Sequence, residues 1–114
     1  MIKLSALISV HNEEKQLKAC LERLGFADEI VVVLDRCTDG TRSIAEGFTD
    51  QVIEGAWEIE GDRRNAAIKA CNGEWIVEVD ADERVSDELA KEVRTVINHS
   101  NFAWHEIPVD NYVG

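Results

Sequence analysis

The sequence predicts an α/β domain in which a mostly parallel sheet carries helices on both faces. Short apolar runs rich in β-branched residues alternate with helical segments along all 114 residues. One run, residues 30–34, is apolar throughout, as expected of a parallel strand buried on both faces. The length fits a single domain over residues 1–114, and 45% hydrophobic residues with one proline supply a core.

Five strands and four helices are expected. The strands are predicted at residues 3–10, 29–34, 51–54, 75–79 and 102–109. Asn12 is predicted to cap a first helix that Gly25 closes, and further helices are expected at residues 44–48, at 62–71 and after Ser86. Apolar residues at helical spacing predict two buried stripes, one at Leu17, Cys20, Leu21 and Leu24, and one at Leu89, Val93, Val96 and Ile97.

Charge and composition exclude several classes of partner. The formal net charge of −11 argues against non-specific binding to nucleic acid or to an anionic membrane. The longest apolar run is far too short to span a bilayer. Three widely spaced cysteines fit neither a disulfide framework nor a metal clip, so we expect reduced thiols. Reduced thiols are typical of a cytoplasmic protein, which could be dissolved in the cytoplasm or bound peripherally at the inner face of the membrane.

Three groups of polar residues could do chemistry. Asp80 and Asp82 follow an apolar strand, and their carboxylates could hold Mg²⁺ or Mn²⁺ beside a phosphate, or form only a solvated acidic turn. Arg63 and Arg64 open a helix and could grip phosphate oxygens, or pair with nearby carboxylates. Asp35 ends a buried strand, where it could accept hydrogen bonds from a base or a sugar, or belong to an ordinary loop.

Five short segments in a fixed order carry a resemblance to a known family. They are Val10-His11-Asn12-Glu13-Glu14, Asp35-Arg36-Cys37-Thr38-Asp39-Gly40-Thr41, Arg64-Asn65, Gly73-Glu74-Trp75-Ile76 and Asp80-Ala81-Asp82-Glu83. With them the chain resembles, over nearly its whole length, the donor half of a family-2 glycosyltransferase. The similarity is greatest to the bacterial lipopolysaccharide-core glucosyltransferase branch, including the closing Asn111-Tyr112-Val113-Gly114.

The resemblance implies a GT-A, Rossmann-like fold that binds a nucleotide-sugar donor, with a UDP-hexose expected, together with Mn²⁺ or Mg²⁺. It implies inverting transfer of the hexose to a hydroxyl of a glycan or lipid-linked glycan, in lipopolysaccharide or other cell-envelope synthesis. Carried over by position, the resemblance places His11, Asn12 and Glu13 in the first nucleotide loop, Asp35 at the base, Arg64 at the nucleotide or diphosphate, Asp80 at the ribose and Asp82 at the metal.

Two departures from the family pattern stand out. The family commonly has Asp-Asp-Gly-Ser where this chain has Leu34-Asp35-Arg36-Cys37. Family enzymes also run well beyond 114 residues, and their later half supplies the acceptor pocket and the catalytic base. We therefore expect a truncated form that supplies donor and metal binding only, whose last strand could present an open edge for self-association.

Two other classes remain as alternatives. A phosphoreceiver-like signalling domain has similar length and architecture, but it needs paired acids after the first strand, where this chain has His11-Asn12-Glu13-Glu14. A non-catalytic interaction module could keep the fold and use its exposed helices to bind a protein. Phosphorylation by a small phosphodonor would identify the first alternative, and loss of nucleotide binding would favour the second.

Overall fold

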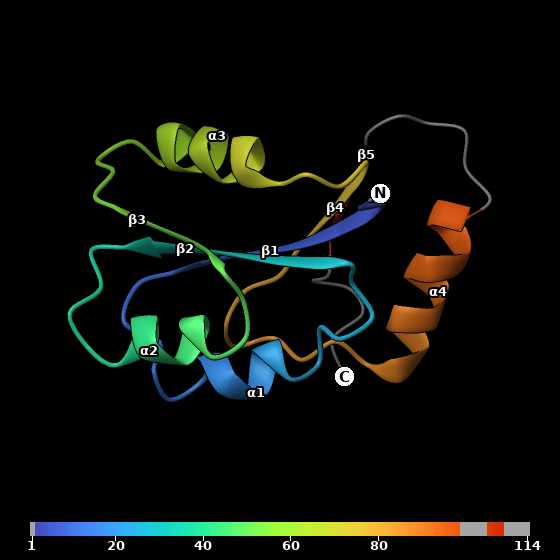
Figure 1. Cartoon of the computed structure of the whole chain (residues 1–114), viewed down its shortest axis with the longest axis horizontal. Helices are drawn as coiled ribbons and strands as arrows, with labels where there is room; N and C mark the ends of the chain where they lie inside the picture. The colour runs from blue at the N-terminus through green and yellow to red at the C-terminus, as the bar shows by residue number, and fades with distance from the viewer. Residues whose placement is uncertain (1, 99–104, 109–114) are drawn as a thin grey trace.

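The computed structural model describes residues 2–98 and 105–108. Its strands are β1 (Leu4–Val10), β2 (Glu29–Asp35), β3 (Gln51–Gly55), β4 (Trp75–Glu78) and β5 (His105–Pro108). They form one sheet in the order β3-β2-β1-β4-β5, and every pairing is parallel (Figure 1). The predicted α/β fold is confirmed, and β5 lies inside the last predicted strand, of which residues 102–104 and 109 fall outside the described residues.

Helices cover both faces of the sheet, as predicted. They are α1 (Leu17–Leu21), α2 (Thr41–Glu46), α3 (Glu60–Ala70) and α4 (Asp87–Asn98). Figure 1 shows α3 on one side of the sheet and α1 and α2 on the other. The buried residues of α1, α2 and α4 share one apolar cluster with the sheet, and Ala67 of α3 belongs to a second cluster on the opposite face.

Alternation along the strands assigns side chains to these two clusters. In β2, Val32 and Leu34 join the cluster under α1, α2 and α4, whereas Val31 and Val33 join the cluster under α3. Successive side chains of a strand point to opposite faces, so a strand buried on both faces is apolar at consecutive positions, as β2 is at residues 30–34. Asp35 is the next residue on the α3 face, and this parity brings its carboxyl group to the side where α3 lies.

The start of the first helix differs from the prediction. Asn12 does not cap a helix, because α1 begins only at Leu17 and Asn12 lies in the left-handed region with φ of 48°. Its side chain bonds to the loop after β2 instead of to helical N–H groups. The helix also ends at Leu21, so Gly25 does not close it, although Leu17, Cys20, Leu21 and Leu24 are all buried as predicted.

The last helix matches its prediction at the start and departs from it at one apolar position. Ser86 Oγ accepts a hydrogen bond from Leu89 N at 3.1 Å, which is the side-chain cap expected at a helix start. Leu89, Val93 and Ile97 are buried, but Val96 is 46% exposed, so its predicted burial is wrong. The buried residues recur at every fourth position, and Val96 lies at the margin of that stripe.

A buried carboxylate, that of Glu29, stabilises the edge of the sheet at which the amino ends of the strands lie. Glu29 Oε2 accepts hydrogen bonds from Ser5 Oγ at 2.5 Å and from Asn72 N at 2.8 Å, and Oε1 accepts one from Asn72 Nδ2 at 2.7 Å. Burial raises the pKa of Glu29, but these bonds outweigh it and hold the pKa below its ordinary value. The cluster ties the α3–β4 loop to β1 and β2.

The described part of the chain offers no helix that is both long and apolar enough to cross a membrane. Cys20, Cys37 and Cys71 are free thiols.

Candidate functional site

The carboxyl ends of β1, β2, β3 and β4 lie at one edge of the sheet and carry the polar segments that the sequence singled out. From β1 the chain adds β2 and β3 on one side, and then crosses to place β4 on the other side of β1. In open α/β sheets, ligands bind outside the carboxyl ends of the strands at such a reversal of strand order. The fold therefore brings His11, Asp35, Trp57 and Asp80 to the edge where a ligand is expected.

The loops after β1 and β2 are joined through Asn12. Its Oδ1 accepts hydrogen bonds from Thr38 N at 2.7 Å and Asp39 N at 3.3 Å, and its Nδ2 donates to Thr38 Oγ1 at 3.3 Å. An asparagine tolerates the left-handed backbone that this arrangement requires. Asn12 thus holds the loop after β1 against the loop after β2.

His11 and Glu13 add further contacts between the same two loops. The Nδ1 of His11 lies 2.8 Å from the carbonyl oxygen of Asp35, which can only accept a hydrogen bond from the ring. The backbone N–H of Glu13 donates to Thr41 Oγ1 at 3.0 Å, and Glu14 Oε2 accepts from Gly40 N at 2.8 Å. The polar side chains of the first loop are therefore used largely to order the second.

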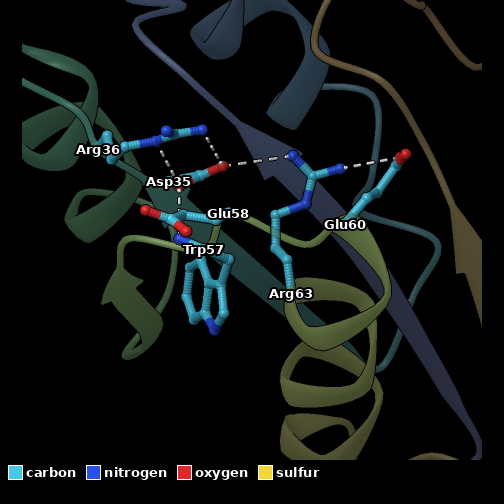
Figure 2. Close-up of a pocket in the computed structure, with 6 residues that line it drawn as sticks. All are labelled: Asp35, Arg36, Trp57, Glu58, Glu60 and Arg63. Carbon is cyan, nitrogen blue, oxygen red and sulfur yellow. Dashed lines mark hydrogen bonds and ion pairs between the residues drawn. The ribbon is translucent and has the colours of Figure 1, made fainter.

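Asp35 lies at the centre of a pocket of about 310 Å³ at the end of β2 (Figure 2). The pocket is lined by Asp35, Arg36, Trp57, Glu58, Glu60 and Arg63. The Asp35 side chain is only 5% exposed. Its Oδ1 accepts hydrogen bonds from Arg36 Nε at 3.2 Å and from Trp57 N at 3.3 Å, and Arg63 Nη1 lies 3.6 Å from Oδ2.

The charge of Asp35 is maintained by these neighbours. Burial raises the pKa of Asp35, but the backbone N–H of Trp57 and the guanidinium groups of Arg36 and Arg63 outweigh burial and hold the pKa below its ordinary value. At neutral pH the pocket therefore presents a carboxylate, which can only accept hydrogen bonds.

The backbone around the pocket is closely constrained. Arg36 has φ of 53°, in the left-handed region that favours glycine, and its N–H donates to Gly55 O at 2.9 Å. A Cβ on Gly55 would lie 2.6 Å from the Trp57 ring, so a side chain there would displace the indole. A non-glycine residue held at positive φ beside a pocket is typical of a functional site.

Arg64, which the sequence selected, points to a different partner from Arg63. Arg64 Nη1 lies 2.9 Å from Glu78 Oε2 and 3.0 Å from Oε1, at the end of β4. Arg63 joins Asp35 to Glu60, whose Oε1 accepts from Nη2 at 3.2 Å. The structure thus divides the two arginines between the β2 and β4 sides of the edge, and the role of Arg64 toward a nucleotide stays a prediction.

The acidic turn after β4 is held by its own residues. Asp80 N donates to Glu83 Oε1 at 2.7 Å, and Glu83 N donates back to Asp80 O at 2.9 Å. Asp80 and Asp82 are exposed. Within residues 2–98 and 105–108, no three metal-ligating side chains converge. Asp80 and Asp82 supply carboxylate oxygens of the kind that Mg²⁺ and Mn²⁺ prefer, and their roles at the ribose and at the metal stay predictions.

Of the six pocket residues, the sequence points only to Asp35 as a site residue, and it names Arg63 only together with Arg64 as a possible pair for phosphate oxygens. Arg36 and Trp57 come next to strand ends, and Arg63 is adjacent to the residue that was chosen. The available signal was topological, because residues that follow parallel strands share one edge of the sheet.

A parallel sheet with helices on both faces, and polar loops at its carboxyl edge, defines an open α/β protein whose ligand-binding edge is the carboxyl edge of the sheet. The match to the model of glycosyl transferase family 2 extends over residues 5–113, and the chain belongs to that family. The fold is the GT-A fold that the resemblance implied.

Individual relatives agree with this assignment. The chain is 32% identical over 100 residues to an uncharacterized glycosyltransferase of Rickettsia bellii, covering 87% of this chain and 34% of the relative. It is 32% identical over 93 residues to the lipopolysaccharide core biosynthesis glycosyltransferase LpsC of Rhizobium meliloti, covering 77% and 34%. The crystal structure of residues 1–349 of Staphylococcus aureus TarS superposes with a TM-score of 0.68 at 29% identity, covering 85% of this chain and 32% of that one.

The chain spans about a third of the length of these relatives. TarS is named as a poly(ribitol-phosphate) beta-N-acetylglucosaminyltransferase. The relatives' names therefore describe proteins of which this chain matches one part.

Proposed function

We propose that this chain is the nucleotide-sugar-binding domain of a metal-dependent, inverting glycosyltransferase that transfers a hexose from a UDP-sugar to a glycan or lipid-linked glycan of the cell envelope. The family supports glycosyl transfer, and the names of LpsC and TarS support envelope glycans as acceptors. The free thiols support a reducing compartment, either in the cytoplasm or at the inner face of the membrane.

The observation that carries the proposal is the buried carboxylate of Asp35, kept ionised in a pocket at the carboxyl edge of the sheet. Burying a charge is costly, and ionised side chains buried in a pocket at a ligand-binding edge are candidates for functional groups. A carboxylate in such a pocket is suited to accept a hydrogen bond from the N–H of a nucleobase. A loop that faces only solvent would not need a buried carboxylate.

The remaining loops would bind the rest of the donor. Asn12 and His11 hold the β1 and β2 loops together and so fix the walls of the site. Asp80 would accept hydrogen bonds from ribose hydroxyls, Arg64 would approach the diphosphate, and Asp82 would bind Mn²⁺ or Mg²⁺. The cation, when bound, neutralises charge that develops on the leaving diphosphate.

The reaction exchanges one bond for another at the anomeric carbon. An acceptor hydroxyl oxygen forms a bond to this carbon from the face opposite the diphosphate, and the bond to the diphosphate oxygen breaks, so the configuration inverts. The hydroxyl proton passes to a base that we do not assign to any residue of this chain.

Calorimetric titration of UDP, with and without Mn²⁺, tests the proposal. We expect binding that depends on the metal and that is weakened at least about tenfold in Asp82→Asn. Asp50→Asn removes the same charge from an exposed position at the amino end of β3 and serves as the matched control. UDP binding that is indifferent to Mn²⁺ would remove the metal from the proposal, and absence of both UDP and GDP binding would refute donor binding by this chain.

A further inference from the structure

Arg84 comes directly after the acidic turn that follows β4, and its guanidinium group bonds back to that turn. Its Nη1 donates hydrogen bonds to Ala81 O at 2.8 Å and to Glu83 O at 2.9 Å. This nitrogen carries two hydrogens, so it can serve both carbonyl groups at once. The residues immediately before and after Asp82 are therefore held by one donor group.

The other terminal nitrogen of Arg84 reaches a different loop. Its Nη2 donates a hydrogen bond to Oε1 of Gln16, the residue immediately before α1. A guanidinium group is planar and presents its donors in fixed directions. Arg84 thus joins the acidic turn after β4 to the end of the loop after β1.

The other contacts of the turn hold mainly its beginning. Asp80 N donates to Glu83 Oε1 at 2.7 Å, and Cys20 Sγ donates to Asp80 O at 3.5 Å. Ala81 is 5% exposed and packs in the apolar cluster under α1. These contacts hold residues 80 and 81, and the contacts of Arg84 extend the support across residue 82 to residue 83.

The position of the Asp82 carboxylate depends on the backbone beneath it, because its side chain is exposed. Carboxylate oxygens are donors that Mg²⁺ and Mn²⁺ prefer, so an accessible aspartate fits such a cation. A turn that is ordered in advance loses less conformational freedom when it binds. Groups that orient a metal-binding side chain typically change metal affinity by about 10–100-fold when they are removed.

We propose that Arg84 is a positioning residue for Asp82, and that Gln16 holds Arg84 in place. Arg84 orders the acidic turn in the form that binds Mn²⁺ or Mg²⁺. This inference rests on the proposed function, which assigns the cation to Asp82. It adds a residue that acts through the backbone of the turn.

The charge of Arg84 gives the test a definite sign. Ala81 O, Glu83 O and Gln16 Oε1 are neutral oxygens, so these three bonds support the turn without cancelling a carboxylate charge. The positive charge itself disfavours a second cation nearby. If charge dominated, removal of Arg84 would strengthen Mn²⁺ binding, whereas removal of a positioning residue weakens it.

Electron paramagnetic resonance of Mn²⁺, titrated into the chain with UDP in excess, measures this binding. The signal of free aqueous Mn²⁺ falls as the ion binds, so the dissociation constant is obtained without any assay of transfer. In Arg84→Met we expect the constant to rise about tenfold or more. Arg84→Lys should recover only part of that loss, because one ammonium group cannot reproduce the planar fork. Gln16→Ala leaves the bonds from Arg84 to the turn and should raise the constant by about twofold to fivefold.

Arg94→Met is the matched control. Arg94 is 34% exposed and donates to Phe26 O at 3.4 Å and to Asp28 Oδ2 at 3.2 Å, just before β2 at the amino edge of the sheet. Its removal should lower the urea midpoint without changing the Mn²⁺ dissociation constant. A loss of Mn²⁺ binding in Arg94→Met equal to that in Arg84→Met would show a general effect of stability and overturn the inference.

The remaining outcomes separate this inference from the proposed function. Unchanged or tighter Mn²⁺ binding in Arg84→Met, or full affinity in Arg84→Lys, would overturn the role of Arg84 and leave the proposed function intact. If Arg84→Met loses its circular dichroism signal, the exposed Gln16 decides, and unchanged Mn²⁺ affinity in Gln16→Ala would overturn the inference. If the unsubstituted chain binds UDP but no Mn²⁺, the metal leaves the proposed function and the inference falls with it.

Discussion

Replacing Gly73 by alanine should destabilise the domain strongly. Gly73 lies in the loop between α3 and β4, and a Cβ there would lie 2.7 Å from both Ser5 N and Ser5 Oγ, and 2.9 Å from Trp75 O. Two of these atoms are backbone of β1 and β4, which pair with each other, so they cannot move without disturbing the sheet. The substitution would also strain the bond from Gly73 N to Ser5 Oγ, now 2.9 Å long.

The expected cost follows from these two effects. Overpacking of this kind costs about 1–3 kcal/mol, and loss of a partly buried hydrogen bond costs about 0.5–1.5 kcal/mol. Together they predict a loss of about 1.5–4.5 kcal/mol in the free energy of unfolding. For a domain of this size, that loss should lower the urea midpoint by about 1–2 M.

Urea unfolding followed by circular dichroism measures the effect, with Gly61→Ala as the matched control. Gly61 lies in α3, and a Cβ added there would meet no atom within 4 Å outside the helix's own backbone. Alanine there should stabilise the helix by about 0.5–1 kcal/mol, so the two glycine substitutions should shift the midpoint in opposite directions. A Gly73→Ala midpoint equal to that of the unsubstituted chain would refute the packing argument.

Three other outcomes follow from the structure. Asn12→Ala should lower stability by about 1–2 kcal/mol and Asn12→Gly by less, since glycine accepts the φ of 48° but makes no bond to the β2 loop; equal losses in urea unfolding would exclude a backbone contribution. The pKa of Glu29 in the folded chain lies below its ordinary value of 4.5. The ionised Glu29 side chain therefore stabilises the fold in full above about pH 4.5, and this stabilisation is lost as the pH falls through the folded-state pKa. Glu29→Gln should therefore be less stable by about 1–3 kcal/mol at pH 7, with the difference shrinking toward pH 3; a constant difference in the urea midpoint would contradict this. Burial raises the pKa of Cys20 to about 11 and that of Cys71 to about 12. At pH 8 a thiol reagent should therefore label both cysteines only after the chain unfolds. Labelling of both in the folded chain, located by mass spectrometry, would contradict the described packing.

The sheet and its helices could be predicted from the sequence because local pattern and tertiary environment agree there. The continuous apolar run of β2 is buried on both faces, and the stripe of Leu17, Cys20, Leu21 and Leu24 is buried on α1 and the turn that follows it. Ser86 is a helix cap in both the sequence pattern and the structure. These features depend on neighbours in the chain, which a single sequence displays.

Features that depend on distant residues could not be predicted in this way. Asparagine is a residue type that often caps helices, but the side-chain oxygen of Asn12 accepts hydrogen bonds from the backbone of Thr38 and Asp39, 26 and 27 residues away. The choice between Arg63 and Arg64 depends on the rotation of α3 relative to the sheet, which sequence spacing does not fix. Glu29 begins a strand in the pattern, yet its burial follows from where the α3–β4 loop passes.

Mapping the binding site of UDP by nuclear magnetic resonance tests the central claim most directly. In a ¹⁵N-labelled chain titrated with UDP and Mg²⁺, we predict shifts in the indole N–H of Trp57 and in the backbone amides of Arg36 and Arg63. The indole of Trp75, which is 2% exposed in the core, should not move. A second pocket lies at the amino edge of the sheet and is lined in part by Phe48 and Gln51. Shifts confined to that pocket, or a spectrum that UDP does not change, would contradict the account.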